Sequence, residues 1–195
     1  MPNLLIPGWV VPTIVAAVVV LLVIIVVAVC VGAYNSFVKM RNACEEAWAT
    51  IDVYLKKRCD LIPNLVETVK GYAKHESGTL ESVIAARNAA MSADAPKDKI
   101  AAENALTGTL RSLFAVAEAY PQLQANTNFL DLQNQLKQIE TELANARKYY
   151  NATVRQINTK MQTFPSNLIA GMMKLEKFEY YEIEEGDRQN VKVQF

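Results

Sequence analysis

The segment FLDLQNQLKQIETELANARKYY, residues 129–150, carries an apolar side chain at every third or fourth position. This spacing places the apolar side chains on one stripe of an α-helix, and steps that alternate between three and four form the heptad seam of packed helices. Beyond residue 150 the stripe slips by one position and continues to Phe164, which predicts one helix of about 35 residues. The members of the seam are Phe129, Leu132, Leu136, Ile139, Leu143, Ala146 and Tyr150.

Residues 37–73 contain a second long stripe with the same steps, and Pro63 lies inside it. The proline ring removes one backbone donor and crowds the carbonyl group of Cys59. Because the stripe keeps its phase on both sides of Pro63, we expect a kinked helix that continues, with Asp60 capping the restarted turn. Pro63 is therefore a candidate hinge, and a packing adjustment without a direct role is the alternative. The stripe consists of Phe37, Met40, Cys44, Trp48, Ile51, Leu55, Cys59, Ile62, Val66, Val69 and Ala73.

Shorter helices are predicted between the two long ones, and a last short helix is predicted after Pro165. Only seven glycines and seven prolines punctuate the 195 residues, which favours long helices over many short strands. The two long helices match in length, so we expect them to lie antiparallel. The predicted fold is all-α: an N-terminal transmembrane helix that continues into a long antiparallel bundle of about four helices, with a short extended C-terminal tail. The predicted parts are residues 1–33, 34–175 and 176–195.

Residues 14–31, IVAAVVVLLVIIVVAVCV, form an uninterrupted apolar run without a charge. Together with its two neighbours this run spans roughly 30 Å as a helix, which is the thickness of the hydrocarbon layer. A cleaved signal peptide is the alternative, but no Lys or Arg precedes the run, and the run is longer than a typical signal core. The predicted membrane contacts are Ile14, Leu21, Leu22, Ile25 and Val31, with Trp9 and Tyr34 at the two interfaces.

The distribution of Lys and Arg around this run predicts a single-pass orientation. No basic residue precedes the run, whereas Lys39, Arg41 and then Lys56, Lys57 and Arg58 follow it. Basic loops stay on the cytoplasmic side, so we expect the N-terminus outside and the bundle in the cytoplasm.

Two further groups of residues are candidates for contacts with other molecules. Lys56, Lys57 and Arg58 form a basic cluster that we interpret as a solvated face or as partners in an intermolecular salt bridge. The opposite charges are supplied by Glu182, Glu184 and Glu185 in the acidic tail. The tail ends with Val191, Val193 and Phe195 alternating with polar residues, a pattern typical of an extended segment. Such a tail either folds back on the bundle or adds to a neighbouring chain.

The sequence contains no arrangement that predicts catalysis, a metal or a cofactor. It lacks a nucleophile elbow, a phosphate-binding loop and an HExxH motif. Its three cysteines are too far apart for a zinc site and are expected to be small buried apolar side chains, and it has a single histidine. With 20 basic and 20 acidic residues there is no electrostatic reason to expect nucleic-acid binding.

Five stretches resemble the LemA family of bacterial membrane proteins: YNSFVKMRNACEEAW, IDVYLKKRCDLIPNLVETVKGYAKHE, FAVAEAYPQLQANTNFLDLQ, ARKYYNATVRQIN and FPSNLIAG. The resemblance covers essentially the whole chain after the apolar run, although Asn190 stands where a proline is common near the family's usual ending. It implies an N-terminal membrane helix, an antiparallel helical bundle, no established enzymatic activity and a location in the bacterial inner membrane. Relatives in magnetosome membranes imply a part in organising membranes.

These observations favour a non-enzymatic, membrane-anchored scaffold that forms a homo-oligomer through its membrane helix, its long helices and its tail. The alternative is an adaptor or envelope-stress sensor that presents a partner, such as a membrane peptidase or a signalling protein. In the sensor hypothesis Pro63 acts as the hinge.

Overall fold

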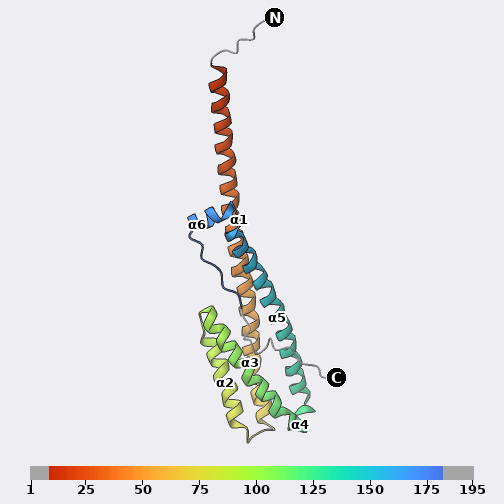
Figure 1. Cartoon of the computed structure of the whole chain (residues 1–195). Helices are drawn as coiled ribbons and strands as arrows, with labels where there is room; N and C mark the ends of the chain where they lie inside the picture. The colour runs from red at the N-terminus through yellow and green to blue at the C-terminus, as the bar shows by residue number, and fades with distance from the viewer. Residues whose placement is uncertain (1–8, 182–195) are drawn as a thin grey trace, which may run out of the picture. The chain divides into compact units, whose positions relative to one another are not determined.

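The computed structural model describes residues 9–181, in which it contains six α-helices and no β-strand (Figure 1). The two long helices are α1 (Val10–Lys70) and α5 (Thr127–Gln162). The shorter ones are α2 (Ser77–Ser92), α3 (Pro96–Glu118), α4 (Pro121–Gln124) and α6 (Ser166–Met172). The predicted all-α fold is confirmed, including the two long helices and the short helix after Pro165.

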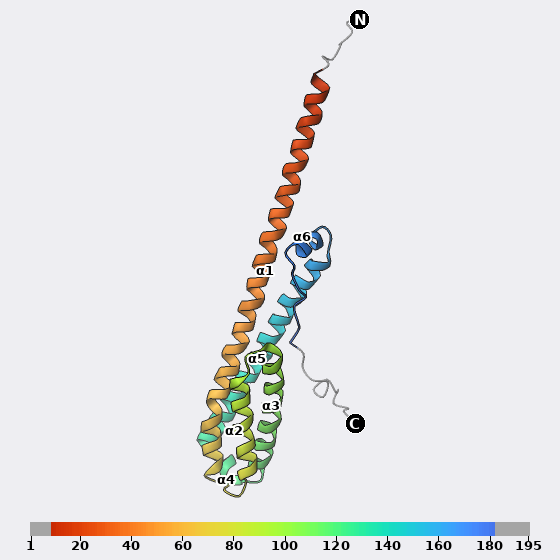
Figure 2. The same ribbon diagram turned by 90° about the vertical axis from the view of Figure 1, so that its left-hand side faces the viewer.

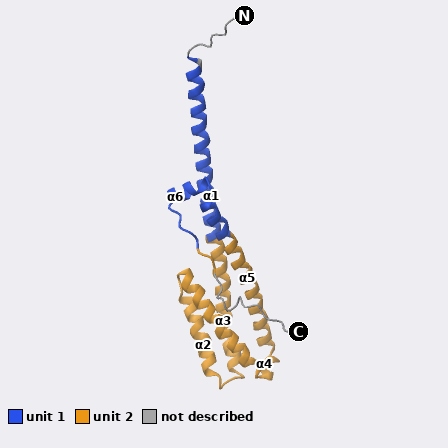
Figure 3. Cartoon of the chain, in the orientation of Figure 1, with its two compact units in different colours: residues 1–44, 153–178 blue, residues 45–152, 179–195 orange. Residues whose placement is uncertain are grey.

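The chain forms two compact units, and α1 and α5 contribute residues to both (Figure 3). Unit 1 comprises Met1–Cys44 and Thr153–Phe178, and unit 2 comprises Glu45–Ala152 and Glu179–Phe195. Unit 1 therefore contains the apolar run of α1, the last residues of α5 and all of α6. Unit 2 contains the remainder of the two long helices together with α2, α3 and α4.

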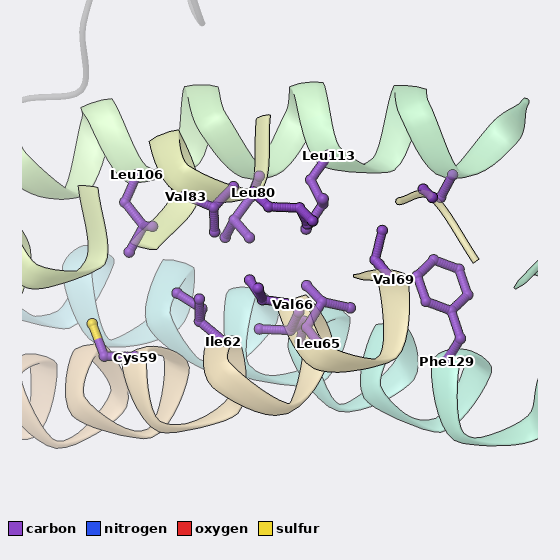
Figure 4. Packing of buried hydrophobic residues seen from close by; sticks show 14 of the residues in the cluster. Cys59, Ile62, Leu65, Val66, Val69, Leu80, Val83, Leu106, Leu113 and Phe129 are labelled. Carbon is purple, nitrogen blue, oxygen red and sulfur yellow. The ribbon is translucent and has the colours of Figure 1, made fainter. Parts of the chain in front are cut away.

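Unit 2 is an antiparallel bundle in which α2 and α3 pack beside α1 and α5 (Figure 2). Trp48, near the start of this part of α1, contacts Tyr150, whereas Arg58 further along α1 contacts Glu140. Residues later in α1 therefore contact residues earlier in α5, as antiparallel packing requires. Figure 4 shows the core between these helices, with Leu106 and Leu113 of α3 facing the α1 side chains. The labelled α1 members are Cys59, Ile62, Leu65, Val66 and Val69.

Helix α1 continues through Pro63, as the unbroken phase of the stripe predicted. Pro63 has no N–H to donate to the carbonyl oxygen of Cys59, which is four residues earlier and buried. That oxygen instead accepts a hydrogen bond from Nε of Arg87 in α2, at 2.8 Å. A side chain from a neighbouring helix therefore satisfies the acceptor that the proline leaves unpaired, which explains how the helix continues without losing a buried hydrogen bond.

We expect Arg87→Ala to destabilise unit 2 by about 1–3 kcal/mol, because it leaves the partly buried carbonyl group of Cys59 without its donor. In a Pro63→Ala background the same substitution should cost much less, since the substituted alanine supplies a backbone N–H to the carbonyl oxygen of Cys59. Urea unfolding of the four proteins of this double-mutant cycle, followed by circular dichroism in detergent, measures the coupling. Equal costs in both backgrounds would show that Arg87 acts independently of the proline.

The segment that follows α6 is held to α5 through the side chains of two asparagines. In unit 1, Asn158 donates to the carbonyl oxygen of Phe178 at 2.9 Å and accepts from its N–H at 3.0 Å. In unit 2, Asn151 makes the same pair of bonds with the backbone of Tyr181, at 3.0 and 2.8 Å. Up to Tyr181, then, the C-terminal segment packs on helices of its own chain.

Candidate functional site

The most prominent polar feature of unit 2 is a buried ionic cluster around Arg58 of α1. Arg58 is 2% exposed, and its Nη1 donates to Oε2 of Glu103 in α3 at 3.0 Å. Its Nη2 lies 2.7 Å from Oε1 of Glu140 in α5 and donates to Oγ1 of Thr107 at 3.0 Å. One guanidinium thus connects three helices of the bundle through charge-assisted hydrogen bonds.

The placement of Arg58 on a solvated face is wrong. Its position explains why, because Arg58 lies three residues after Leu55 and four before Ile62, on the apolar stripe itself. Its charge is neutralised by Glu103 and Glu140 inside the chain, which leaves it unavailable as an exposed partner for another molecule.

Lys56 and Lys57 are exposed, and both remain candidates for intermolecular contacts. Lys56 forms an ion pair with Asp60 at 3.5 Å, one helical turn away. The Lys57 ammonium lies 5.3 Å from the centre of the Tyr54 ring. Both contacts are local and solvated, so they leave these side chains free to exchange partners at little cost.

Burial dominates the electrostatics around the cluster. It raises the pKa of the Glu103 carboxyl, and the Arg58 guanidinium opposes the rise. A raised folded-state pKa means that the contribution of Glu103 to stability is largest below its ordinary pKa and is lost as pH increases. Burial likewise raises the pKa of the neighbouring Cys59 thiol to about 11. Cys59 is therefore a neutral core side chain at physiological pH, and Cys44 is buried as well, as the sequence predicted for these two.

A groove of about 560 Å³ opens beside the cluster between α3 and α5. Arg58, Arg111, Lys137 and Glu140 supply its charges. Because Arg58 is paired with Glu103 and Glu140, the further cations of the groove are Arg111 and Lys137. Leu110, Phe114 and Leu136 form its apolar wall, and two amides, Gln133 and Asn134, complete it. This lining suits an anionic group that is attached to an apolar one.

Tyr181 belongs to a second hydrophobic cluster of unit 2, against which the aromatic side chains of Trp48 and Tyr150 pack. Its ring lies 6.0 Å from that of Trp48 and 4.6 Å from the Arg147 guanidinium, and it is almost completely buried. The Tyr150 hydroxyl donates to the carbonyl oxygen of Glu179 at 3.0 Å. The sequence did not predict this anchor, because Tyr181 stands among the acidic residues of the predicted tail, residues 176–195. Trp48 and Tyr150, one on each predicted long stripe, were the signal for an aromatic cluster.

The apolar run of α1 is exposed on all sides among the described residues. It is long and apolar enough to cross a membrane, and none of the 18 residues in its most apolar part is buried. The predicted membrane contacts Ile14, Leu21, Leu22, Ile25 and Val31 are each about half exposed, which is typical of a helix with no neighbour. Trp9 and Tyr34, at the two ends of the run, are exposed as well. Residues 14–31 are thus a candidate transmembrane helix.

The proline of α1 and the acidic tail are the remaining predicted sites. Pro63 is exposed on the outer side of α1, and its role as a hinge stays a prediction. Glu182, Glu184, Glu185, Val191, Val193 and Phe195 lie outside the described residues.

The described residues offer several surfaces for contacts with other molecules. Across residues 9–181, no group of three or more His, Cys, Asp or Glu side chains is placed to hold a metal ion. The buried carboxylate of Glu103 is committed to Arg58, and the Cys59 thiol is protonated at neutral pH. These surfaces are an apolar helix, a groove that contains Arg111 and Lys137, and the exposed lysines Lys56 and Lys57.

Comparison with known proteins finds one matching family model and several similar proteins. A model of the LemA family matches residues 47–195. Protein LemA of Metamycoplasma hominis is 24% identical over 167 residues, which are 84% of this chain and 75% of that protein. Magnetosome protein MamQ of Magnetospirillum gryphiswaldense is 22% identical over 174 residues, and magnetosome protein MamQ 1 of Paramagnetospirillum magneticum is 22% identical over 175. Both matches cover 76% of this chain but only 64% of the MamQ protein.

Proposed function

The chain belongs to the LemA family, and from this premise we propose that it is a non-enzymatic, membrane-anchored scaffold that associates with further copies of itself. The observation that carries the proposal is the apolar run of α1, whose side chains no other described residue covers. An apolar surface of this length is stable only in lipid or against another apolar helix. The bundle would then be held at the bilayer, where it organises membrane or partner proteins.

The sequence of the run supports association between copies. Ala28 and Gly32 are four residues apart and so lie on one face of α1. A side chain added at Gly32 would meet nothing within 4 Å, so this face is open. Small residues at this spacing let two membrane helices approach closely.

Particle mass in detergent tests the association. We expect mass photometry of the full chain to report particles of two or more copies at micromolar concentration. Gly32→Leu should lower the average copy number, because its side chain blocks the close approach of helices. Gly108→Leu is the matched control, since Gly108 is an exposed helical glycine with equally open space around it. A strictly monomeric wild-type particle would contradict the proposal.

We place the bundle in the cytoplasm and the N-terminus outside, in the inner membrane of a bacterium. The support for this orientation is the complete absence of charged residues from residues 1–33 and the presence of Lys39 and Arg41 directly after them. The MamQ relatives are named magnetosome proteins, and this name supports a membrane location for the present chain.

An adaptor that presents a partner protein is the second candidate, and the groove between α3 and α5 favours it. The groove combines the cations Arg111 and Lys137 with an apolar wall, so an acidic segment with an apolar side chain would fit it. Crosslinking in membranes separates the two functions. Self-crosslinks in stoichiometric yield favour the scaffold, whereas one heterologous product favours the adaptor.

A further inference from the structure

Helix α6 and the turn before it expose three large apolar side chains. Leu168 and Met172 are four residues apart on α6, and Phe164 lies in the turn that leads into the helix. The side chains of Leu168, Met172 and Phe164 are 60%, 80% and 79% exposed, in that order. The opposite side of α6 is packed, because Ala170 is buried and Ile169 is half-buried. We call Phe164, Leu168 and Met172 the outer face of α6.

Within unit 1, α6 lies close to the point where the apolar run of α1 ends. Lys160, near the end of α5, donates to the Ser36 hydroxyl of α1 and lies 5.6 Å from the centre of the Phe37 ring. Phe164 follows Lys160 by four residues, and the apolar run ends five residues before Ser36. Both ribbon views draw α6 beside the part of α1 that follows the run (Figures 1 and 2).

The parts of unit 1 outside the apolar run are strongly basic. Residues 34–44 and 153–178 contain six cationic side chains and one anionic side chain, a net charge of +5 in a chain whose total is zero. The cations are Lys39, Arg41, Arg155, Lys160, Lys174 and Lys177, against Glu176. Basic residues next to a membrane helix attract the anionic headgroups of the lipid surface.

We propose that α6 is an interfacial helix whose outer face is inserted among the lipid headgroups next to α1. An interfacial helix needs apolar side chains that enter the lipid and basic residues that stay in the headgroup layer. Unit 1 has both, and it also contains the candidate transmembrane helix. The chain then contacts the bilayer at two places within unit 1, and α6 limits how deeply α1 is inserted. This inference goes beyond the scaffold role and holds equally for a monomer.

Spin labels placed on α6 test the contact. The full chain, with Cys30, Cys44 and Cys59 replaced by alanine, is labelled at single cysteines that replace Phe164, Leu168 or Met172. It is reconstituted in vesicles of phosphatidylcholine and phosphatidylglycerol. We expect all three labels to collide more often with oxygen, which enters lipid, than with a water-soluble nickel complex. The order should be reversed at Asn167 on the same helix and at Met91, an exposed apolar residue of unit 2.

Two results would overturn the inference. One is a label at Leu168 that is as accessible to the nickel complex as the label at Met91, because that result places the outer face in water. The other is a label inaccessible to both reagents, because that places the face against protein. A label at Leu22 tests the membrane helix separately. A lipid signal there with a water signal on α6 refutes only the contact of α6, whereas a water signal at Leu22 refutes the anchor itself.

Discussion

Replacing Arg58 with alanine is expected to destabilise unit 2 by about 3–5 kcal/mol. The substitution removes the partner of two carboxylates, and Glu103 is only 1% exposed. Glu140 is 42% exposed and can turn to water, whereas Glu103 cannot be hydrated without opening the core. Most of the loss therefore comes from the buried charge of Glu103, which loses its hydrogen-bonded partner and keeps only the more weakly interacting Arg147 guanidinium as a counter-charge. Thermal unfolding of the full chain in detergent should show a midpoint about 10 °C lower.

Two comparison variants separate this explanation from a general loss of packing. Lys56→Ala removes an ion pair of similar type on the surface and should change stability by less than about 1 kcal/mol. Arg58→Met combined with Glu103→Leu removes both buried charges and keeps the volume, so much of the stability should return. If the double variant is no more stable than Arg58→Ala, then the isolated charge of Glu103 is not the cause. Lowering the pH should also lessen the effect of Arg58→Ala, because a protonated Glu103 needs no counter-charge.

The sequence predicted the long helices because their signal is local and repeated many times. Eleven stripe positions between Phe37 and Ala73 need only a 3.6-residue period to be recognised as a helix face, and nine of them are buried, including both cysteines. The continuation through Pro63 followed from the same phase. What the sequence could not supply was the reason that the helix tolerates the proline, because Arg87 is 28 residues away from the Cys59 carbonyl that it binds.

The misplacement of Arg58 has the same physical origin. The side chain stands next to Lys56 and Lys57, so its neighbours along the chain indicate a solvated face. Its real partners are 45 and 82 residues away, on α3 and α5, and pairing over that distance depends on how the helices pack. Their spacing contained a clue, since Arg58 lies between Leu55 and Ile62, and Glu103 lies between Ile100 and Leu106, each at helical intervals. Two opposite charges on the inner faces of two helices are a reason to expect a buried pair.

The paired substitution Leu22→Arg and Ile25→Arg is expected to abolish membrane integration. The run contains fourteen Val, Leu and Ile side chains, which together favour insertion by about 4–8 kcal/mol. Two arginines near the centre of the helix oppose insertion by about 5–7 kcal/mol, which is enough to cancel that sum. Carbonate extraction of membranes should therefore leave the wild-type chain in the pellet and move most of the variant to the supernatant.

Val53→Arg is the matched control, because Val53 lies on the same helix and is 52% exposed, against 56% for Leu22. The two side chains differ in the solvent that we assign to them, since Val53 belongs to unit 2 and faces water. An arginine there should change neither the extraction nor the helical content. Equal behaviour of the two variants would mean that exposed apolar side chains of α1 meet the same solvent along its whole length. In that case residues 14–31 would not be inserted in lipid, and the anchoring of the bundle would need another cause.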